Sequence, residues 1–363
     1  MTSVRRFFGN FRRRCIAAID SHDGRAELVT QAEPVTDEQI AAAATAKLAS
    51  DRIDWVRCIP FFLLHLACFA VVFVGWSWPA LIVAFALYVV RMHAITGWYH
   101  RYFSHRTFKT NRFWQFFWAS VGNSSAQRGP LWWAAHHRHH HRYSDEPEDI
   151  HSPKQRGFWW SHMAWFLTKT NYRSNMEVVP DLAKYPELVW LDRFDCVMPT
   201  ILGFACFGLG MALQHWGYQT SGAQMLVWGF VISTVFTAHA TFTINSLSHV
   251  FGTRRYETSD TSKNNFLLAL LTLGEGWHNN HHHYQSTARQ GFRWYEIDVS
   301  YYLLVVQSWL RMVRDLKPVP EHVVKGLTLA ESKAAGPAAP ELAEAARTAQ
   351  PSSFLLKSRE PAA

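Results

Sequence analysis

The chain has 363 residues, of which 48% are hydrophobic, 15% aromatic and only 18% charged, against roughly 25% charged residues in soluble domains. Its 36 Lys and Arg exceed its 28 Asp and Glu, which gives a formal net charge of +8 at pH 7. These values exclude a disordered chain. Five cysteines without a CxxC spacing indicate neither a zinc ribbon nor a redox pair nor a disulfide scaffold. The 20 histidines are the unusual feature of the composition.

Residues 1–50 are polar and begin with a basic cluster in which phenylalanines interleave with arginines. An amphipathic segment on an anionic membrane surface, an organelle transit peptide and a solvated basic tail are alternative interpretations of this segment. Asp37 to Trp55 then predicts an alanine-rich helix that leads up to a membrane. Residues 331–363 are rich in Ala and Pro, which predicts a disordered or weakly helical tail without chemistry. One membrane domain is expected between them, over residues 51–320.

Four apolar stretches, at about residues 58–76, 78–98, 196–216 and 224–244, each approach the roughly 20 residues that cross a bilayer. A very short turn around Ser77 joins the first two, and Gly217 to Gly222 joins the last two. The pattern therefore predicts an all-α membrane protein with four transmembrane helices in two hairpins. Aromatic residues at the ends of the stretches are typical of membrane interfaces and disfavour buried helices of a large soluble protein.

Lys and Arg flank the outer ends of both predicted hairpins, whereas the linkers inside the hairpins contain neither residue type. By the positive-inside rule, both termini and the large middle loop are expected in the cytoplasm. Every histidine cluster then falls on the cytoplasmic side of the membrane.

The histidines form three tight clusters. They are His100-x-x-x-x-His105, His137-x-x-His140-His141 and His278-x-x-His281-His282. Residues i, i+3 and i+4 of an α-helix lie within roughly 50° of a common direction, so each HxxHH is expected to aim three imidazoles at one point, as in a metal site. Residues i and i+5 diverge by about 140° on a regular helix. Either the helix ends between His100 and His105, or the two histidines serve different metal ions.

Eight histidines in three clusters are too many for a single ion, so two ions are the natural count. Imidazole suits zinc, copper, iron and nickel. The HExxH motif of zinc proteases is absent. Neutral ligands beside a membrane favour iron and oxygen activation against an apolar substrate, although zinc-dependent hydrolysis stays open at this point.

The clusters HRYFSH, HRHHH and HNNHH resemble the three histidine boxes of membrane fatty acid desaturases, most closely those of the Δ9 acyl-CoA (stearoyl-CoA-type) desaturases, in a bacterial form. The resemblance spans about residues 60–310. It extends to the segments Ser104-His-Arg-Thr-Phe108, Gly157-Phe-Trp-Trp-Ser-His162, Asn245-Ser-Leu-Ser-His249 and Gly274-Glu-Gly-Trp-His278.

The resemblance implies a cytoplasmic helical cap on four transmembrane helices, with a di-iron centre in the cap. The implied iron ligands are His100, His105, His137, His140, His141, His249, His278, His281 and His282. A water-mediated contact from Asn245 is also implied. In the second box the resemblance leaves His136 and His139 as extras, although helical spacing alone permits His136-x-x-His139-His140 equally well. In the third box it leaves His283 as an extra.

The implied reaction is the O2-dependent insertion of a cis double bond, at the Δ9 position, into a saturated acyl chain held in an apolar tunnel. The first choice of substrate is an acyl-CoA, and the second is the acyl group of a phospholipid. Animal acyl-CoA desaturases carry an Arg-Asp pair directly before the second box, where this chain has Ala135 and His136. This departure leaves the acyl carrier less well supported than the chemistry.

No cytochrome b5, flavin or nucleotide signature is visible, so a separate electron donor is expected: a ferredoxin, a rubredoxin, or cytochrome b5 with its reductase. No nucleic-acid partner is expected, and a bacterial inner membrane is the expected location. Alternative interpretations are a fatty acyl hydroxylase or alkane monooxygenase and, from another class, a membrane protein that binds or transports metal.

Overall fold

The computed structural model describes residues 51–324 and 326, which all belong to one compact unit, Ala49–Ala363. The basic segment of residues 1–50 and the predicted tail of residues 331–363 lie outside the described residues, as does most of the helix predicted for Asp37 to Trp55. The division of the chain into two polar extensions and a membrane domain therefore stays a prediction.

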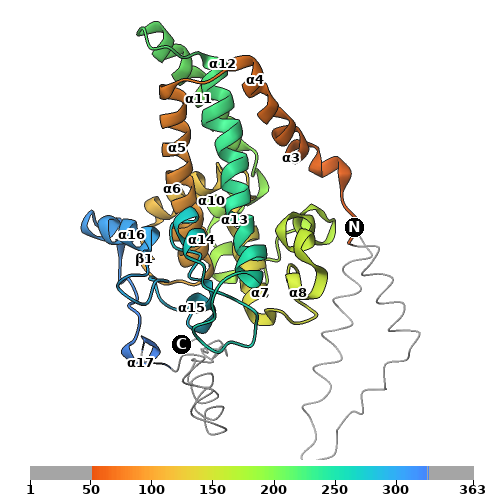
Figure 1. Cartoon of the computed structure of the whole chain (residues 1–363), viewed down its shortest axis with the longest axis vertical. Coiled ribbons are helices and arrows are strands. Elements are labelled where there is room, and N and C mark those ends of the chain that lie inside the picture. Colours follow the sequence, from red (N-terminus) through yellow and green to blue (C-terminus); the bar gives the residue numbers. More distant parts are fainter. Residues whose placement is uncertain (1–50, 325, 327–363) are drawn as a thin grey trace, which may run out of the picture. The chain divides into compact units, whose positions relative to one another are not determined.

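Four helical segments are long and apolar enough to cross a membrane. They are Trp55–Val74, Trp78–Ser104, Val197–His215 and Gly222–Val250. The predicted architecture of four spans in two hairpins is thereby confirmed (Figure 1). The second and fourth spans run further than the sequence predicted, because their helices continue past the apolar stretch into residues that include histidines.

The first hairpin consists of α3 (Trp55–Ala67), η1 (Cys68–Ala70) and α4 (Val71–Val74), followed by α5 (Trp78–His93) and η2 (Ala94–Ser104). Gly75 ends α4 with a φ of +63°, and the Ser77 hydroxyl caps α5 by accepting a hydrogen bond from the Ala80 N–H. Side chains of α3 such as Leu63 and Leu66 are exposed, as expected of a helix that faces lipid.

The second hairpin consists of α11 (Val197–His215), followed by α12 (Gly222–Met225), η6 (Leu226–Ile232) and α13 (Ser233–Val250). Its two arms meet closely at Gly210, where an added Cβ would lie 2.4 Å from the Ser221 carbonyl oxygen. The hairpins pack against each other through α5, which contacts both η6 and α13. The central pair of spans is thus the second and the fourth.

The remaining elements lie at the end of the spans away from the two hairpin turns (Figure 1). Between the hairpins these are β1 (Lys109–Thr110), α6 (Arg112–Asn123), α7 (Pro130–Tyr143), α8 (Pro153–Arg156), η3 (Trp160–Ala164), η4 (Trp165–Leu167), η5 (Thr170–Tyr172), α9 (Pro180–Ala183) and α10 (Pro186–Arg193). After the second hairpin they are α14 (Phe266–Leu271), α15 (His278–His283), α16 (Val299–Trp309), β2 (Val313–Arg314) and α17 (Glu321–Val324).

The largest buried cluster of hydrophobic side chains forms where η2 meets α6, α7 and α10. It includes Trp98, Phe103, Leu131 and Leu188, all fully buried. The antiparallel pairing of β1 with β2, Lys109 opposite Arg314, joins the segment after the first hairpin to the region after α16. This core holds η2 and α7, which carry histidines of the first and second clusters, in fixed positions.

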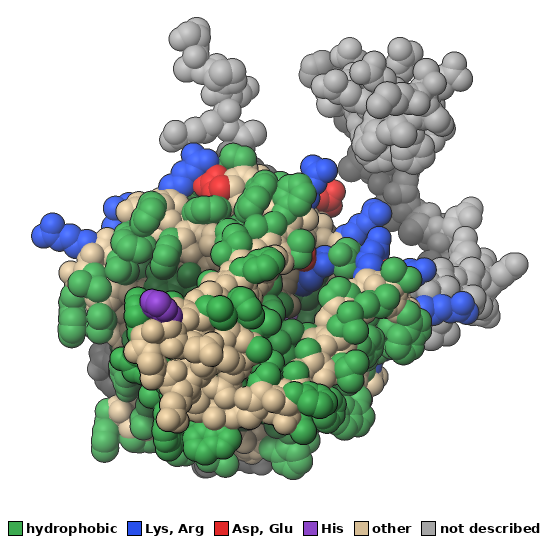
Figure 2. Space-filling view, turned by 90° about the horizontal axis from the view of Figure 1, so that it is seen from above, with side chains coloured by type: hydrophobic (Ala, Val, Ile, Leu, Met, Phe, Trp, Pro, Cys, Tyr) green, Lys and Arg blue, Asp and Glu red, His purple; other side chains and the backbone are tan. Residues whose placement is uncertain are grey.

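The end of the spans that carries the two hairpin turns lies opposite the histidine-bearing end. Hydrophobic side chains cover much of this face, and basic side chains show mainly around its margin (Figure 2). The charge distribution agrees with a membrane-embedded bundle. The cytoplasmic location of the histidine-bearing end stays a prediction.

Candidate metal centre

His100 and His105 lie in and directly after η2, which is a π-helix. Its i→i+5 hydrogen bonds include that from the His105 N–H to the His100 carbonyl oxygen, at 3.3 Å. In this winding, residues five apart face the same side. The helix does end between the two histidines, at Ser104, but the alternative of separate metal sites is wrong, because both imidazoles belong to one group.

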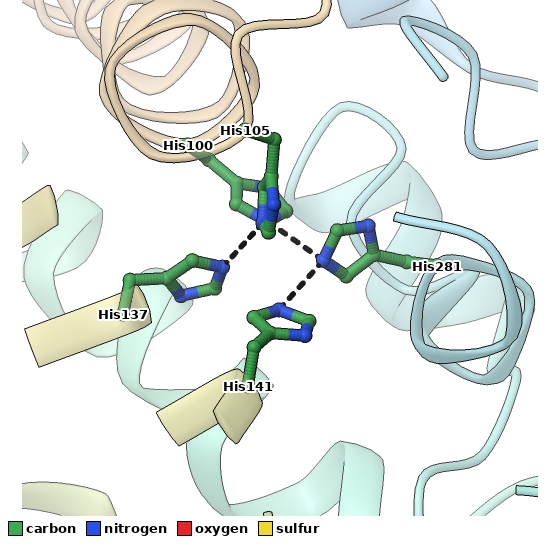
Figure 3. A group of neighbouring side chains, drawn as sticks. All are labelled: His100, His105, His137, His141 and His281. Atoms are coloured by element: carbon green, nitrogen blue, oxygen red, sulfur yellow. Dashed lines mark hydrogen bonds between the residues drawn. The ribbon is translucent and has the colours of Figure 1, made fainter. Parts of the chain in front are cut away.

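The nine histidines that the sequence singled out gather in two groups. The first group is His100, His105, His137, His141 and His281, and the second is His140, His249, His278 and His282. Within each group the candidate ligand nitrogens lie within 4.8 Å of one another. Figure 3 shows the imidazoles of the first group, which come from three separate segments, converging on one point.

The expectation that each HxxHH motif aims all three imidazoles at one point is wrong. In α7, His137 and His141 belong to the first group, whereas His140 belongs to the second. In α15 the division is reversed, with only His281 in the first group. The reason is that residues i and i+4 diverge by about 40° on an α-helix, whereas adjacent residues diverge by about 100°. Each motif therefore contributes to both groups.

Carboxylates lie on the Nδ1 side of several of these imidazoles. The pairs are His100 with Glu275 at 2.5 Å, His140 with Asp149 at 3.0 Å and His282 with Asp260 at 2.6 Å. An Nδ1–H that donates to a carboxylate fixes the ring orientation and leaves the Nε2 lone pair free to bind a metal. This arrangement is typical of histidines that ligate metal ions.

His249 is supported less directly. Its Nδ1 lies 3.2 Å from the Thr261 hydroxyl and 3.7 Å from Asp145, and Thr261 donates to the same Asp145 carboxylate at 2.6 Å. His140, Asp149 and His151 form a third group of possible ligands. Because Asp149 faces the Nδ1 of His140, we interpret this third group as the support of His140 and not as another metal site.

Glu275 is itself held by a buried ion-pair network. Arg101 lies 3.0 Å from Glu275 and 2.9 Å from Asp298. The chain can approach this closely because Gly274 has a φ of +128°, and an added Cβ there would lie 2.3 Å from a carboxylate oxygen of Asp298. The Gly-Glu-Gly turn before the third box thus places the carboxylate behind His100.

The contacts among the central nitrogens of each group do not provide every nitrogen with a hydrogen bond of its own. His281 Nε2 lies 3.0 Å from His100 Nε2 and 2.9 Å from His141 Nε2, and one N–H cannot serve both contacts. In the second group the buried His282 Nε2 has no hydrogen-bond partner among the described residues. Since buried polar atoms are rarely left unpaired, a cation at the centre of each group fits the residues present.

The protonation of these histidines also fits a cation site. Burial and the neighbouring imidazoles hold the pKa well below its ordinary value in His105, His137, His141, His278 and His281. Burial alone would lower the pKa of His140 as well, but the charge and hydrogen bond of Asp149 raise it. The imidazoles are therefore mostly neutral, which is the form that binds metal.

The three extra histidines of the boxes lie outside both groups. The Nδ1 of His136 contacts the Trp132 carbonyl oxygen at 2.8 Å, and the Nε2 of His139 contacts the Glu148 carbonyl oxygen at 2.9 Å. His283 stacks on Tyr256, with ring centroids 4.2 Å apart. Of the two possible registers in the second box, the structure brings His137, His140 and His141 to the centre.

Asn245 lines a small cavity of about 40 Å³ between the two groups. Histidines of both groups line the same cavity, namely His100 and His137 of the first and His140 and His278 of the second. The volume is enough for a water molecule. This position is consistent with the water-mediated contact expected of Asn245.

A much larger cavity, of about 930 Å³, lies between α3, α7, α11 and α13. Its walls are mostly apolar, and Trp133, His137, Thr241 and Asn245 line both this cavity and the small one. The large cavity therefore reaches the first histidine group. Its volume is in the range of pockets that bury a small organic ligand.

The acidic residues around the centre were not among the site residues predicted from the sequence. Asp145 and Asp149 follow the second box closely, and Glu275 precedes the third box by three residues, so proximity to the boxes was the available signal. Asp260 lies far from any box in the sequence. Its contact with His282 depends on how the loop after α13 folds back.

Four spans with two buried histidine groups at one end define a membrane protein with a histidine-rich metal site. The chain belongs to the fatty acid desaturase family, whose model matches residues 76–299. This confirms the resemblance seen in the histidine boxes. Membership makes the protein an oxidoreductase of lipid metabolism.

Curated relatives cover most of the chain. It is 37% identical over 272 residues to Delta-9 acyl-lipid desaturase 1 of Arabidopsis thaliana, which covers 73% of this chain and 84% of the relative. It is 34% identical over 269 residues to an sn-1 stearoyl-lipid 9-desaturase of Anabaena variabilis, covering 73% and 94%. It is 33% identical over 311 residues to an acyl-CoA 5-desaturase of Anemone leveillei, covering 82% and 92%.

Proposed function

We propose that this protein is an O2-dependent desaturase that inserts a cis double bond at the Δ9 position of a saturated acyl chain. Two iron ions would be held by the two histidine groups, five imidazoles in the first and four in the second. The observation that supports this most strongly is that the first of these groups adjoins an apolar cavity of about 930 Å³ within the membrane-spanning bundle. A metal site and a place for a long apolar substrate thus adjoin each other.

A bound pair of irons would activate O2. Such activation is required because an unactivated C–H bond has no group that an acid, a base or a nucleophile can attack. The reaction removes one hydrogen from each of two neighbouring methylenes. With two external electrons and two protons, O2 leaves as two water molecules. The electrons come from a separate donor, for which a ferredoxin, a rubredoxin and cytochrome b5 are the candidates.

The residues of this chain position the reactants. The apolar walls of the cavity hold the chain and exclude water, with each buried CH2 contributing about 0.8 kcal/mol. Glu275, Asp149 and Asp260 orient the imidazoles behind which they lie. Asn245 would hold a water molecule in the small cavity between the groups. Correct placement of the target carbons is itself a large part of such catalysis.

The sequence favours coenzyme A as the acyl carrier and a membrane lipid as the second candidate. The relatives bear names of both kinds, an acyl-lipid desaturase in Arabidopsis thaliana and an acyl-CoA desaturase in Anemone leveillei. We further propose a bacterial inner membrane as the location, with the histidine groups on the cytoplasmic side.

The decisive test is expression in a desaturation-deficient host, with the double bonds then located in free, CoA-linked and lipid-linked acyl chains. We expect a cis alkene, and no product in His140→Ala, although that variant should still insert into the membrane. An alcohol as the product would indicate a hydroxylase instead. Full activity of His140→Ala would refute the role of this histidine as a ligand.

A further inference from the structure

One side of the large cavity is a groove between α3 and α11. Pro60, Phe61 and Leu64 line it from α3, and Thr200, Gly203, Phe204 and Phe207 line it from α11. We call this the α3–α11 groove. Its floor is α13, which contributes the buried residues Thr234, Ala238 and Phe242. Seen from the end with the hairpin turns, the molecule is hollowed between hydrophobic ridges (Figure 2).

The groove is open along the membrane-spanning part of the molecule. Phe204 lines it and yet is 74% exposed, and Phe207 is 42% exposed. On the opposite wall Pro60 is exposed as well. Because these residues belong to helices that cross the membrane, the opening faces lipid acyl chains and not water.

The open wall is held in place from its inner side. The Nε2 of His65 on α3 lies 2.9 Å from the Nε2 of His239 on α13, and the other ring nitrogen of His239 lies 3.0 Å from His162. This chain of contacts fixes α3 to the floor of the groove. The side of α3 that faces α11 is where the cavity lies.

One end of the same cavity is basic. Arg57 and Arg128 both line it, and their guanidinium groups lie 4.4 Å and 3.8 Å from the centroid of the Tyr172 ring. Each arginine also has an acidic neighbour, Asp54 at 3.2 Å from Arg57 and Asp195 at 3.0 Å from Arg128. Arg57 lies in the first turn of α3, and Arg128, which precedes α7, is paired with Asp195 directly before α11. The starts of α3 and α11 lie at the end of the spans that carries the histidine groups.

We propose that the acyl chain reaches the histidine groups sideways from the bilayer, through the α3–α11 groove, as part of a phospholipid whose phosphate contacts Arg57 and Arg128. The inference rests on the proposed desaturation and specifies its substrate and access route. Arginine suits a phosphate because its N–H groups can donate two parallel hydrogen bonds.

The charge at this end favours a lipid over an acyl-CoA. Two arginines, each already paired with a carboxylate, leave little net positive charge for the several phosphates of coenzyme A. A single phosphodiester can share the guanidinium groups with these carboxylates. The apolar, open groove also accommodates the second acyl chain of a phospholipid. An acyl-CoA has only one acyl chain.

Gly203 gives the groove its width at the middle of α11. A Cβ built there would be 3.5 Å from Phe230 and 3.7 Å from Leu226, both of which line the cavity, so a larger side chain would project into it. Gly208, on the same helix, has nothing within 4 Å of an added Cβ. Gly208→Leu is therefore the matched control for Gly203→Leu.

The test uses the full-length protein in phosphatidylcholine liposomes that contain a phosphatidylcholine with a diazirine in one acyl chain. After irradiation, adducts are mapped by mass spectrometry. We expect adducts on Thr234, Ala238 and Phe242, which lipid around the outside of the bundle cannot reach. Gly203→Leu should lower their yield about tenfold, because the added side chain fills the groove, and Gly208→Leu should leave it unchanged.

The headgroup contact is tested in the same liposomes. Arg57→Gln should lower the yield of these adducts several-fold, whereas Arg52→Gln, at an exposed position of the same segment, should not. Equal yields in Gly203→Leu and the native chain, or displacement of the adducts by stearoyl-CoA but not by excess phospholipid, would overturn the proposal. Labelling requires no turnover, so intact labelling without desaturation would support the route while contradicting the proposed function.

Discussion

His136 and His137 are neighbours in α7 and have the same side chain, yet the structure gives them different surroundings. His137 belongs to the first histidine group, whereas His136 contacts the Trp132 carbonyl oxygen and packs beside Trp165. Burial lowers the pKa of His136 to about 4, so it is neutral at physiological pH without any metal. The residue type alone therefore does not tell which of the two histidines belongs to a group that could hold a metal ion.

We expect His137→Ala to lower desaturation more than about 100-fold, because loss of even a supporting residue of a metal site typically costs about 10–100-fold. His136→Ala should retain iron at the native stoichiometry. Iron per protein, measured by elemental analysis after purification, separates the two variants. Iron loss in His136→Ala with retention in His137→Ala would place the second box in the other register.

Glu275 provides a second prediction for a single residue. Glu275→Gln keeps the shape of the side chain but removes the charge that faces His100 and Arg101. We expect iron affinity to fall about 10–100-fold, measured by competition with a chelator. The control is Glu187→Gln, since the Glu187 carboxylate on α10 pairs with Arg112 on α6 and not with a histidine of either group. Equal affinity in both variants would show that Glu275 does not support the site.

At the scale of elements, the centre depends on how α7 is fixed against its neighbours. Arg138 projects from α7 and binds Asp181 of α9 at 2.7 Å, and its guanidinium also donates to the Phe103 carbonyl oxygen at 2.7 Å. Arg106 binds the same carboxylate at 2.6 Å. The Asp181 side chain thereby connects the second histidine box to the segment that carries the first.

Burial alone would raise the pKa of Asp181, but the hydrogen bonds and charges of Arg138 and Arg106 lower it from 3.8 to about 2. A carboxyl group whose pKa is lowered by folding stabilises the folded state at pH values above its ordinary pKa. This stabilisation is lost as the pH falls toward 2. Asp181→Asn should therefore reduce stability by about 1–2 kcal/mol at pH 7. Melting temperatures in detergent should differ at pH 7 and converge below pH 4; a constant difference would contradict the assignment.

The π winding of η2 is a further property of an element that the sequence did not reveal. Hydrophobic spacing predicted a span to about residue 98, and on a regular helix continued through both residues, His100 and His105 would diverge. The packing of Trp98 and Phe103 into the buried core and the ion pairs of Arg101 accompany the wider winding. Local propensity does not include such tertiary contacts.

At the scale of the whole molecule, the hairpin topology makes a prediction about the two sides of the membrane. The test uses a chain whose native cysteines are replaced by alanine, in intact cells treated with a maleimide that does not cross the membrane. A variant with Tyr218→Cys, in the turn between α11 and α12, should react with this maleimide. Arg142→Cys, next to the second box, should react only after the membrane is opened. The reverse pattern would invert the orientation expected from the basic flanks.

The sequence by itself determined the number of spans, their pairing into hairpins and eight of the nine histidines that the fold gathers, because apolar length and short-range spacing are written directly along the chain. The ninth, His249, was indicated only by the resemblance to the desaturase family. Only the tertiary structure decided the division of those histidines into groups of five and four, since the second and third boxes each supply both groups. It also decided which acids stand behind them, as with Asp260 and His282, which lie 2.6 Å apart across 22 positions of sequence. Such pairings depend on how separate segments pack, and no periodicity within one segment encodes them.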